Sequence, residues 1–156
     1  MIRMLSAIAA AGALALPASA APTPQEAEVV AAMQRFFDAM AAQDKAALAA
    51  LVLPGSMFTS VRVAPDKTLK VSRVSIEQFT ANLRPGLHEA MWTPRVSLRG
   101  EMIATLSAPY EFQLDGKTTH CGIDAFDFAK VDGAWKVTGG LWTAEPDACP
   151  ELKARR

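Results

Sequence analysis

The first part of the chain has the apolar spacing of amphipathic helices. Thr23 with Glu26, and Ser75 with Gln78, match the capping-box pattern that begins helices. After Thr23, apolar side chains recur every three or four residues, at Val29, Met33, Phe36, Phe37 and Met40. The spacing predicts one helix from residue 24, a short helix over residues 45–51 and a third from residue 76, with short strands over residues 57–63 and 69–74.

From residue 89 the apolar positions alternate with a period of two, which is typical of strands that bury one face. Asp115-Gly116 and Asp132-Gly133 interrupt this alternation, and Asp-Gly pairs between such runs are strong hairpin signals. Strands are predicted over residues 89–99, 102–114, 118–131 and 134–143. The pattern as a whole predicts an α+β fold, with three N-terminal helices packed on a curved antiparallel sheet.

The last hairpin sets the predicted register of its two strands. A two-residue loop at Asp132-Gly133 places Phe126 opposite Gly139 and Asp124 opposite Leu141. A glycine opposite a large ring leaves space or lets a sheet bend. Because a bent sheet covered by helices encloses a pocket, we expect one on this face.

The preceding hairpin admits two registers. A two-residue loop would put Tyr110 on the face of Cys121, whereas a three-residue loop over residues 115–117 pairs Phe112 with His120 and Tyr110 with Gly122. We prefer the three-residue loop because it gathers the large apolar groups on one face, and a slip of one residue would scatter them.

Three polar side chains, Tyr110, His120 and Asp124, lie on this predicted apolar face. Burying an unpaired carboxylate is costly, so Asp124 needs a partner or a wet pocket. It is either a general base with His120 and Tyr110 as partners, or a structural acid bonded to a helix end or a backbone amide. The candidate ligand-binding residues of this face are Tyr110, Phe112, His120, Asp124, Phe126 and Leu141.

The two cysteines, Cys121 and Cys149, leave two readings open. Cys121 is expected on the outer face of the sheet and Cys149 just past the last strand, so a disulfide could tie the tail across the sheet. Two free thiols are the alternative. Since neighbouring strand residues point to opposite faces, Cys121 and His120 are not expected to form a nucleophilic pair.

The N-terminus has the order of a secretory signal peptide. Arg3 precedes an apolar run over residues 5–16, and Ala18-Ser19-Ala20 matches the small-residue cleavage pattern. We expect a signal peptide over residues 1–20, a single domain over 21–148 and a flexible tail over 149–156. The apolar run is too short for a membrane span, and no later run reaches that length. The expected location is therefore periplasmic or secreted, with no membrane association after cleavage.

Composition narrows the function classes. The chain has 16 basic and 16 acidic residues and no basic run, which argues against nucleic-acid binding. Its two histidines, His88 and His120, lack the spacing of metal ligands, so no metal site is expected.

The strand sequences resemble a known superfamily. The ending Asp132-Gly133-Ala134-Trp135-Lys136-Val137 after helices and a meander is similar to nuclear transport factor 2-like proteins. Ala108-Pro109-Tyr110-Glu111-Phe112 and His120-Cys121-Gly122-Ile123-Asp124 more specifically resemble the lumazine-binding-type branch. The resemblance covers roughly residues 24 to 144 and implies a cone-shaped fold, a small apolar pocket, no fixed cofactor and frequent dimers through the open sheet face.

The chain departs from the ketosteroid isomerases of that superfamily. Their aspartate base falls within the segment 54–59 here, which contains no acid. Relatives with a histidine pair on the last strand would place it at Gly139 and Leu141. An isomerase of that type is therefore not expected.

Three functions remain open. The first is an exported binding or accessory domain for a small apolar or aromatic ligand, without a complete catalytic set. The second is a proton-transfer enzyme of isomerase, dehydratase or cyclase type that uses Asp124 with His120 and Tyr110. The third is an interaction protein with a filled interior. A homodimer is expected through an apolar outer face that includes Trp142.

Overall fold

The structure is a computed structural model that describes residues 21–154 and 156. The expected signal peptide, residues 1–20, lies outside the described residues. The elements are, in order, α1 (Pro24–Ala41), α2 (Lys45–Leu51), β1 (Val52–Val63), β2 (Leu69–Ser75), α3 (Ile76–Ala81), β3 (Leu87–Met91), β4 (Arg95–Arg99), β5 (Ile103–Leu114), β6 (Lys117–Val131), β7 (Ala134–Ala144) and α4 (Cys149–Lys153).

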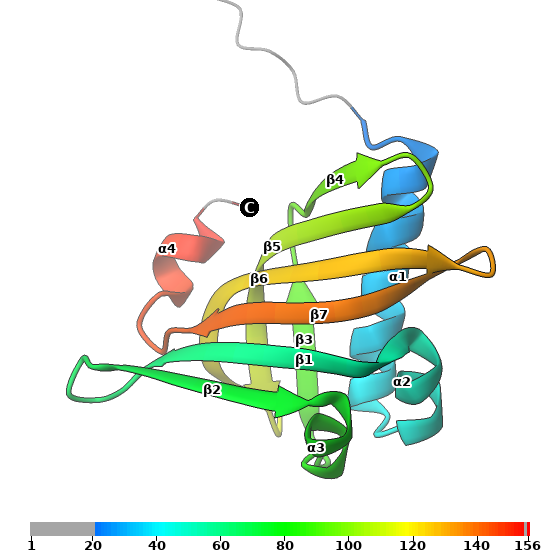
Figure 1. Cartoon of the computed structure of the whole chain (residues 1–156). Coiled ribbons are helices and arrows are strands. Elements are labelled where there is room, and N and C mark those ends of the chain that lie inside the picture. The colour runs from blue at the N-terminus through cyan, green and yellow to red at the C-terminus, as the bar shows by residue number, and fades with distance from the viewer. Residues whose placement is uncertain (1–20, 155) are drawn as a thin grey trace, which may run out of the picture.

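The strands form one strongly curved sheet (Figure 1). Its order is β2-β1-β7-β6-β5-β3, and β4 also pairs with β5. All neighbours are antiparallel except β1 and β7, which run parallel. α1 packs across the concave face against β3, β4, β5 and β7, so the interior lies between this helix and the bend of the sheet.

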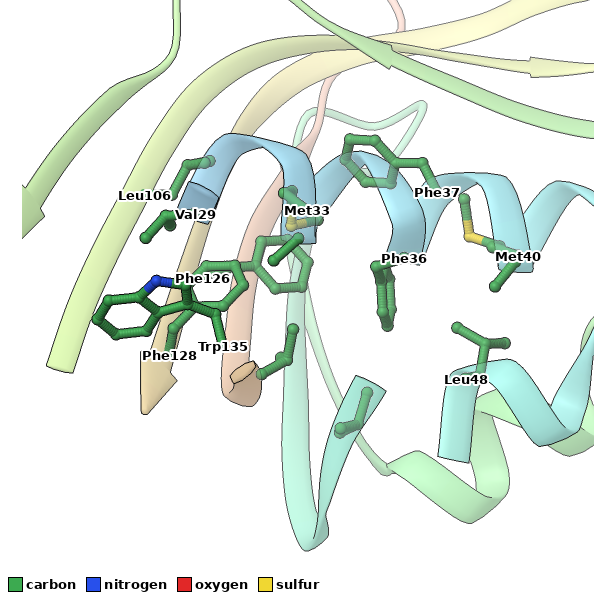
Figure 2. Packing of buried hydrophobic residues seen from close by; sticks show 14 of the residues in the cluster. Val29, Met33, Phe36, Phe37, Met40, Leu48, Leu106, Phe126, Phe128 and Trp135 are labelled. Atoms are coloured by element: carbon green, nitrogen blue, oxygen red, sulfur yellow. The ribbon is translucent and has the colours of Figure 1, made fainter. Parts of the chain in front are cut away.

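The core begins with the apolar stripe of α1. Its capping box at Thr23 and Glu26 is formed as predicted, and the stripe faces the sheet. Figure 2 shows this stripe against rings and aliphatic side chains from β5, β6 and β7. The packed residues include Val29, Met33, Phe36, Phe37, Met40, Leu106, Phe126, Phe128 and Trp135, each at most 4% exposed. Burial of this stripe is the main term holding α1 on the sheet.

The predicted helix arrangement needs one correction. Only α1 and α2 precede the first strand, so the fold does not have three N-terminal helices; α3 begins after β2, at the residue that its capping box predicts. The predicted strand over 89–99 is likewise two strands. Thr93 between them has a φ of 43°, and Pro94 has no amide hydrogen to continue the ladder.

The β5–β6 register is confirmed pair by pair, with Phe112 opposite His120 and Tyr110 opposite Gly122. Its origin differs from the prediction. The turn is the two-residue Asp115-Gly116, and a bulge at Thr119 supplies the extra residue.

The predicted β6–β7 register is wrong beyond the pair Phe128 and Val137. A bulge at Thr138 advances β7 by one residue, so Asp124 lies opposite Trp142 instead of Leu141. Leu141 is consequently on the outer face, where it is 48% exposed. Trp142, expected on the outer face, turns into the concave side.

The segment expected to be a flexible tail forms α4. A disulfide joins Cys149 to Cys121 on β6, with the Cα atoms 5.0 Å apart, and Leu152 is buried beside it. Lys153 Nζ lies 2.7 Å from Glu111 Oε1. These contacts hold the C-terminal segment on the outer face. Among the described residues, no helix combines the length and apolar character needed to cross a membrane.

Candidate functional site

A cavity of about 310 Å³ lies between the concave sheet, α1 and α3. Half of its lining residues carry an aromatic ring, and six of these rings come from α1, α3 and four strands: Phe36, Phe58, Phe79, Phe112, Phe126 and Trp142. Five of the six residues expected to bind a ligand line it, namely Tyr110, Phe112, His120, Asp124 and Phe126. Leu141 does not, and Trp142 takes the place expected of it because of the bulge in β7.

Gly140 makes room for this wall. A Cβ at position 140 would come within 2.6 Å of Phe126 Cε1 and 3.0 Å of Phe58 Cδ1. The ring of Phe126 therefore lies over a position where no side chain fits. Phe126 and Trp142 stand with parallel planes, 6.5 Å between centroids. The expected glycine opposite Phe126 exists, although it is Gly140 instead of Gly139.

A second carboxyl group meets Asp124 at the base of the cavity. Glu89 on β3 lies opposite Phe112, and the curl of the sheet brings its carboxyl within hydrogen-bonding distance of Asp124. Asp124 is 1% exposed, and its Oδ2 has no hydrogen-bond partner within the described part of the chain. Glu89 keeps part of its surface open to the cavity.

The two carboxyl groups hold a proton between them. Burial, followed by the Asp124 charge, raises the pKa of Glu89 well above its ordinary value. Burial also raises the pKa of Asp124 to about 7, against the opposing effect of the hydrogen bond from Glu89. Because two adjacent carboxylates cannot both be ionised cheaply, the pair carries at least one proton at neutral pH. Glu89 is then the donor and Asp124 the acceptor.

Tyr110 lines the cavity, but its hydroxyl is already used. It donates a 2.6 Å hydrogen bond to the backbone oxygen of Thr143. A Cβ at Gly122 would lie 2.0 Å from that oxygen and 2.8 Å from Tyr110 Cε1, so only glycine allows the bond to form. Burial and the nearby carboxyl groups raise the pKa of Tyr110 far above its ordinary value. Tyr110 therefore acts as a fixed part of the wall in this structure.

His120 lies between the two rings of Phe112 and Tyr110. It stacks on Phe112 with 5.1 Å between centroids and meets Tyr110 edge-on. Its Nδ1 is 2.8 Å from the hydroxyl of Thr119. Burial, with a smaller contribution from the charge of Arg62, lowers the pKa of His120 to about 4. The imidazole is therefore neutral at physiological pH.

The mouth of the cavity carries positive charge. Arg62 on β1 and Arg84 beyond α3 line it together with Asn82, and all three are exposed. Within residues 21–154 and 156, neither arginine forms an ion pair with an acidic side chain. The cavity thus has cations at its mouth and an acid pair at its base.

Sequence reasoning missed Glu89, Arg62 and Trp142. A signal existed for Glu89, since it shares strand parity with the apolar residues Leu87 and Met91. For Trp142 no signal existed, because nothing in the local sequence marks the bulge. Over the described residues, no group of three or more His, Cys, Asp or Glu side chains lies together as metal ligands would.

The cone of curved sheet and long helix is shared with solved structures. A protein from Cytophaga hutchinsonii is similar over 78% of this chain and 99% of its own, at 16% identity and a TM-score of 0.62. Its fold is the nuclear transport factor 2-like fold. The present chain has that fold. At such low identity the similarity shows the architecture alone.

Other solved structures similar to this chain differ widely in role. One from Streptomyces avermitilis, proposed to be a dehydratase, covers 76% of this chain and 94% of its own at 15% identity, with a TM-score of 0.55. The association domain of C. elegans CaMKII covers the same shares at 20% identity, with a TM-score of 0.56. No protein-family model and no curated protein matches the sequence.

Proposed function

We propose that this nuclear transport factor 2-like chain binds a small, largely apolar molecule in the cavity above Asp124. One observation carries the proposal: the buried carboxyl group of Asp124, whose partner among the described residues is another acid, Glu89, lines an aromatic cavity of about 310 Å³. A buried acceptor left unpaired is costly, and a ligand that donates a hydrogen bond to it would remove that cost.

A ligand screen by thermal shift tests this proposal. The resemblance to the lumazine-binding-type branch puts flat bicyclic heteroaromatic compounds in the first panel, beside neutral, anionic and cationic apolar compounds. A binding compound is expected to raise the melting temperature of the wild type. The shift should shrink in Phe79→Ala, which removes a partly exposed ring from the cavity wall, and stay unchanged in Asp127→Asn. Asp127 is an exposed acid on β6, the strand that also carries Asp124. Equal shifts in all three proteins would count against the cavity as the site.

A second candidate function is proton transfer, favoured by the acid pair. Asp124 has a pKa of about 7 and touches a protonated Glu89, so it can accept a proton near neutral pH while Glu89 supplies one. A carboxyl pair in an aromatic site suits isomerisation or dehydration. The catalytic residues are then Asp124 and Glu89, while His120 and Tyr110 form part of the cavity wall.

The test of proton transfer follows the screen. Asp124→Asn is expected to keep the affinity for a confirmed ligand within a few-fold and to abolish turnover, whereas Asp127→Asn should leave both unchanged. Turnover that survives in Asp124→Asn would refute the enzymatic reading and leave binding as the function.

We also propose that the protein is exported and forms a homodimer. The Cys121–Cys149 disulfide supports export, because such bonds persist in oxidising compartments. Exposed Met57, Val71 and Leu141 support a dimer through the outer face. Light scattering at micromolar concentration should give a dimeric mass that Leu141→Lys lowers to the monomer. Recovery of the cell-associated protein with its first 20 residues intact would contradict export.

A further inference from the structure

We infer that the cavity selects amphiphilic acids: molecules with an anionic group at one end, an apolar ring body and a hydrogen-bond donor at the other end. The anion would lie at Arg62 and Arg84, and the donor at Asp124. This inference rests on the proposed binding function and adds the chemical class and orientation of the ligand.

The mouth supplies the anion-binding end. Arg62 and Arg84 come from different parts of the chain, β1 and the segment after α3, yet both line the same opening. Each guanidinium is without an acidic partner in the described part of the chain, so its donors remain available. A guanidinium matches a carboxylate or phosphate in charge and geometry. Asn82, on the same rim, adds a neutral amide.

The acidic end of the cavity disfavours an anion and favours a hydrogen-bond donor. Asp124 and Glu89 already share one cavity end and repel any third negative charge. A carboxylate has more acceptor positions than the one bond from Glu89 uses, so Asp124 accepts a further hydrogen bond from a hydroxyl, amide or similar group. The opposite preferences of mouth and base allow an amphiphilic acid to enter in one orientation only.

The wall between these ends accepts flat apolar surface. Phe58, Phe79 and Trp142 form edge-to-face and tilted contacts around the cavity. His120 is buried with its ring stacked on Phe112, so it adds an aromatic face to the wall. An aromatic or alicyclic body therefore fits better than a flexible polar one.

Three related probes separate the two ends. 6-Hydroxy-2-naphthoate carries both the anion and the donor, 2-naphthoate lacks the donor, and 2-naphthol lacks the anion. In titration calorimetry at pH 7.5 and low salt, we expect 6-hydroxy-2-naphthoate to bind about fivefold or more tightly than either of the others. High salt should weaken both naphthoates and leave 2-naphthol unchanged.

Variants locate each end. Arg62→Gln should weaken both naphthoates by about fivefold with little effect on 2-naphthol, since exposed ion pairs contribute modestly. Arg73→Gln, which removes an exposed arginine from the neighbouring strand β2, is the matched control and should change nothing. Arg62→Lys should recover part of the loss. Asp124→Asn should reduce the advantage of 6-hydroxy-2-naphthoate over 2-naphthoate.

The outcomes also separate this inference from the proposed function. If 2-naphthol binds as tightly as the naphthoates and Arg62→Gln changes nothing, the cavity binds apolar molecules and the charge assignment is overturned. If none of the three binds while neutral or cationic compounds of the wider panel do, the ligand class is likewise overturned. If no compound of any class binds, both proposals fail.

Discussion

Two buried carboxyl groups on neighbouring strands show how one residue type takes opposite roles in the same sheet. Glu111 on β5 and Asp124 on β6 are 8% and 1% exposed, respectively. Glu111 faces the outer side, where Lys153 and the hydroxyl of Thr118 bond to Oε1 and Arg156 lies 3.8 Å from Oε2. Asp124 lines the cavity, and its hydrogen-bonding partner among the residues that the structure describes is another acid, Glu89.

The surroundings shift the pKa values of Glu111 and Asp124 in opposite directions. Hydrogen bonds from Lys153 and Thr118 lower the pKa of Glu111, whereas burial raises that of Asp124 to about 7. Glu111 is a satisfied structural group that fastens the C-terminal segment. Asp124 keeps an unmet hydrogen-bonding capacity, which is what a binding or catalytic site requires. Burial alone therefore does not identify a functional acid; the partners do.

The largest expected loss of stability comes from releasing the C-terminal segment, which supplies the basic partners of Glu111. Cys121→Ser/Cys149→Ser removes a disulfide that spans 28 residues of sequence. In the chain-entropy treatment this lowers the free energy of unfolding by about 3–4 kcal/mol. Guanidinium unfolding without reductant measures it. A reducing agent should destabilise the wild type by a similar amount and leave the double variant unchanged, and equal stability of the two proteins would contradict the prediction.

A smaller loss is expected from Glu111 itself. Glu111→Gln removes the charged bonds to Lys153 and Thr118 and should cost about 1–2 kcal/mol, because Lys153 remains partly solvated. Asp127→Asn, on the exposed part of the same face, is the control and should stay within about 0.5 kcal/mol of the wild type. Urea unfolding at pH 7 compares the three proteins. A Glu111→Gln protein as stable as the control would show that the outer acid is not fastening the tail.

Asp124→Asn should change the free energy of unfolding in the opposite direction. The change removes a buried charge beside another acid, so we expect stability equal to the wild type or up to about 1 kcal/mol higher at pH 7. The same urea experiment checks it. A loss above about 2 kcal/mol would mean that Asp124 is a satisfied structural acid like Glu111, and the comparison between the two would fail.

The pH dependence gives the finest distinction, at no more than about 1.4 kcal/mol per pH unit for one proton. The raised pKa of Asp124 stabilises the fold below the ordinary value of 3.8, and this stabilisation is lost as the pH rises towards about 7. The lowered pKa of Glu111 stabilises the fold above the ordinary value of 4.5, and this is lost as the pH falls. Asp124→Asn should therefore reduce the slope of the stability profile between pH 4 and 7, where the raised pKa of buried Glu89 retains part of it, and Glu111→Gln should change only the profile at lower pH. Chemical unfolding across this range tests both; identical profiles for the two variants would remove the distinction.

Local signals predicted most of the fold. The capping boxes at Thr23 and Ser75 begin helices where expected, because the side chain and the amide that it satisfies lie within one turn. The β5–β6 register was also predictable, since a single register gathers the large rings on one face.

The site was less predictable because it depends on long-range geometry. The bulge at Thr138 exchanges the faces of Leu141 and Trp142, and a strand of alternating residues tolerates either register locally. The meeting of Glu89 with Asp124 depends on how far the sheet curls between β3 and β6, which alternation does not encode. Asp124 could be predicted as a site residue because its position in the strand alternation places it on the concave face. Its partner Glu89 could not be predicted without knowing how strongly the sheet curves.

The parallel pairing of β1 with β7 has a consequence for how the protein folds. Met57 bonds in register with Gly139, so a strand from the first half of the chain waits for the last strand before its ladder is complete. Contacts between such distant segments slow folding, because a long loop must close before they contribute. Until β7 arrives, the β1–β2 hairpin leaves one backbone edge open to other chains. The nascent chain therefore depends on staying unfolded, or on being shielded, until residue 144 is available.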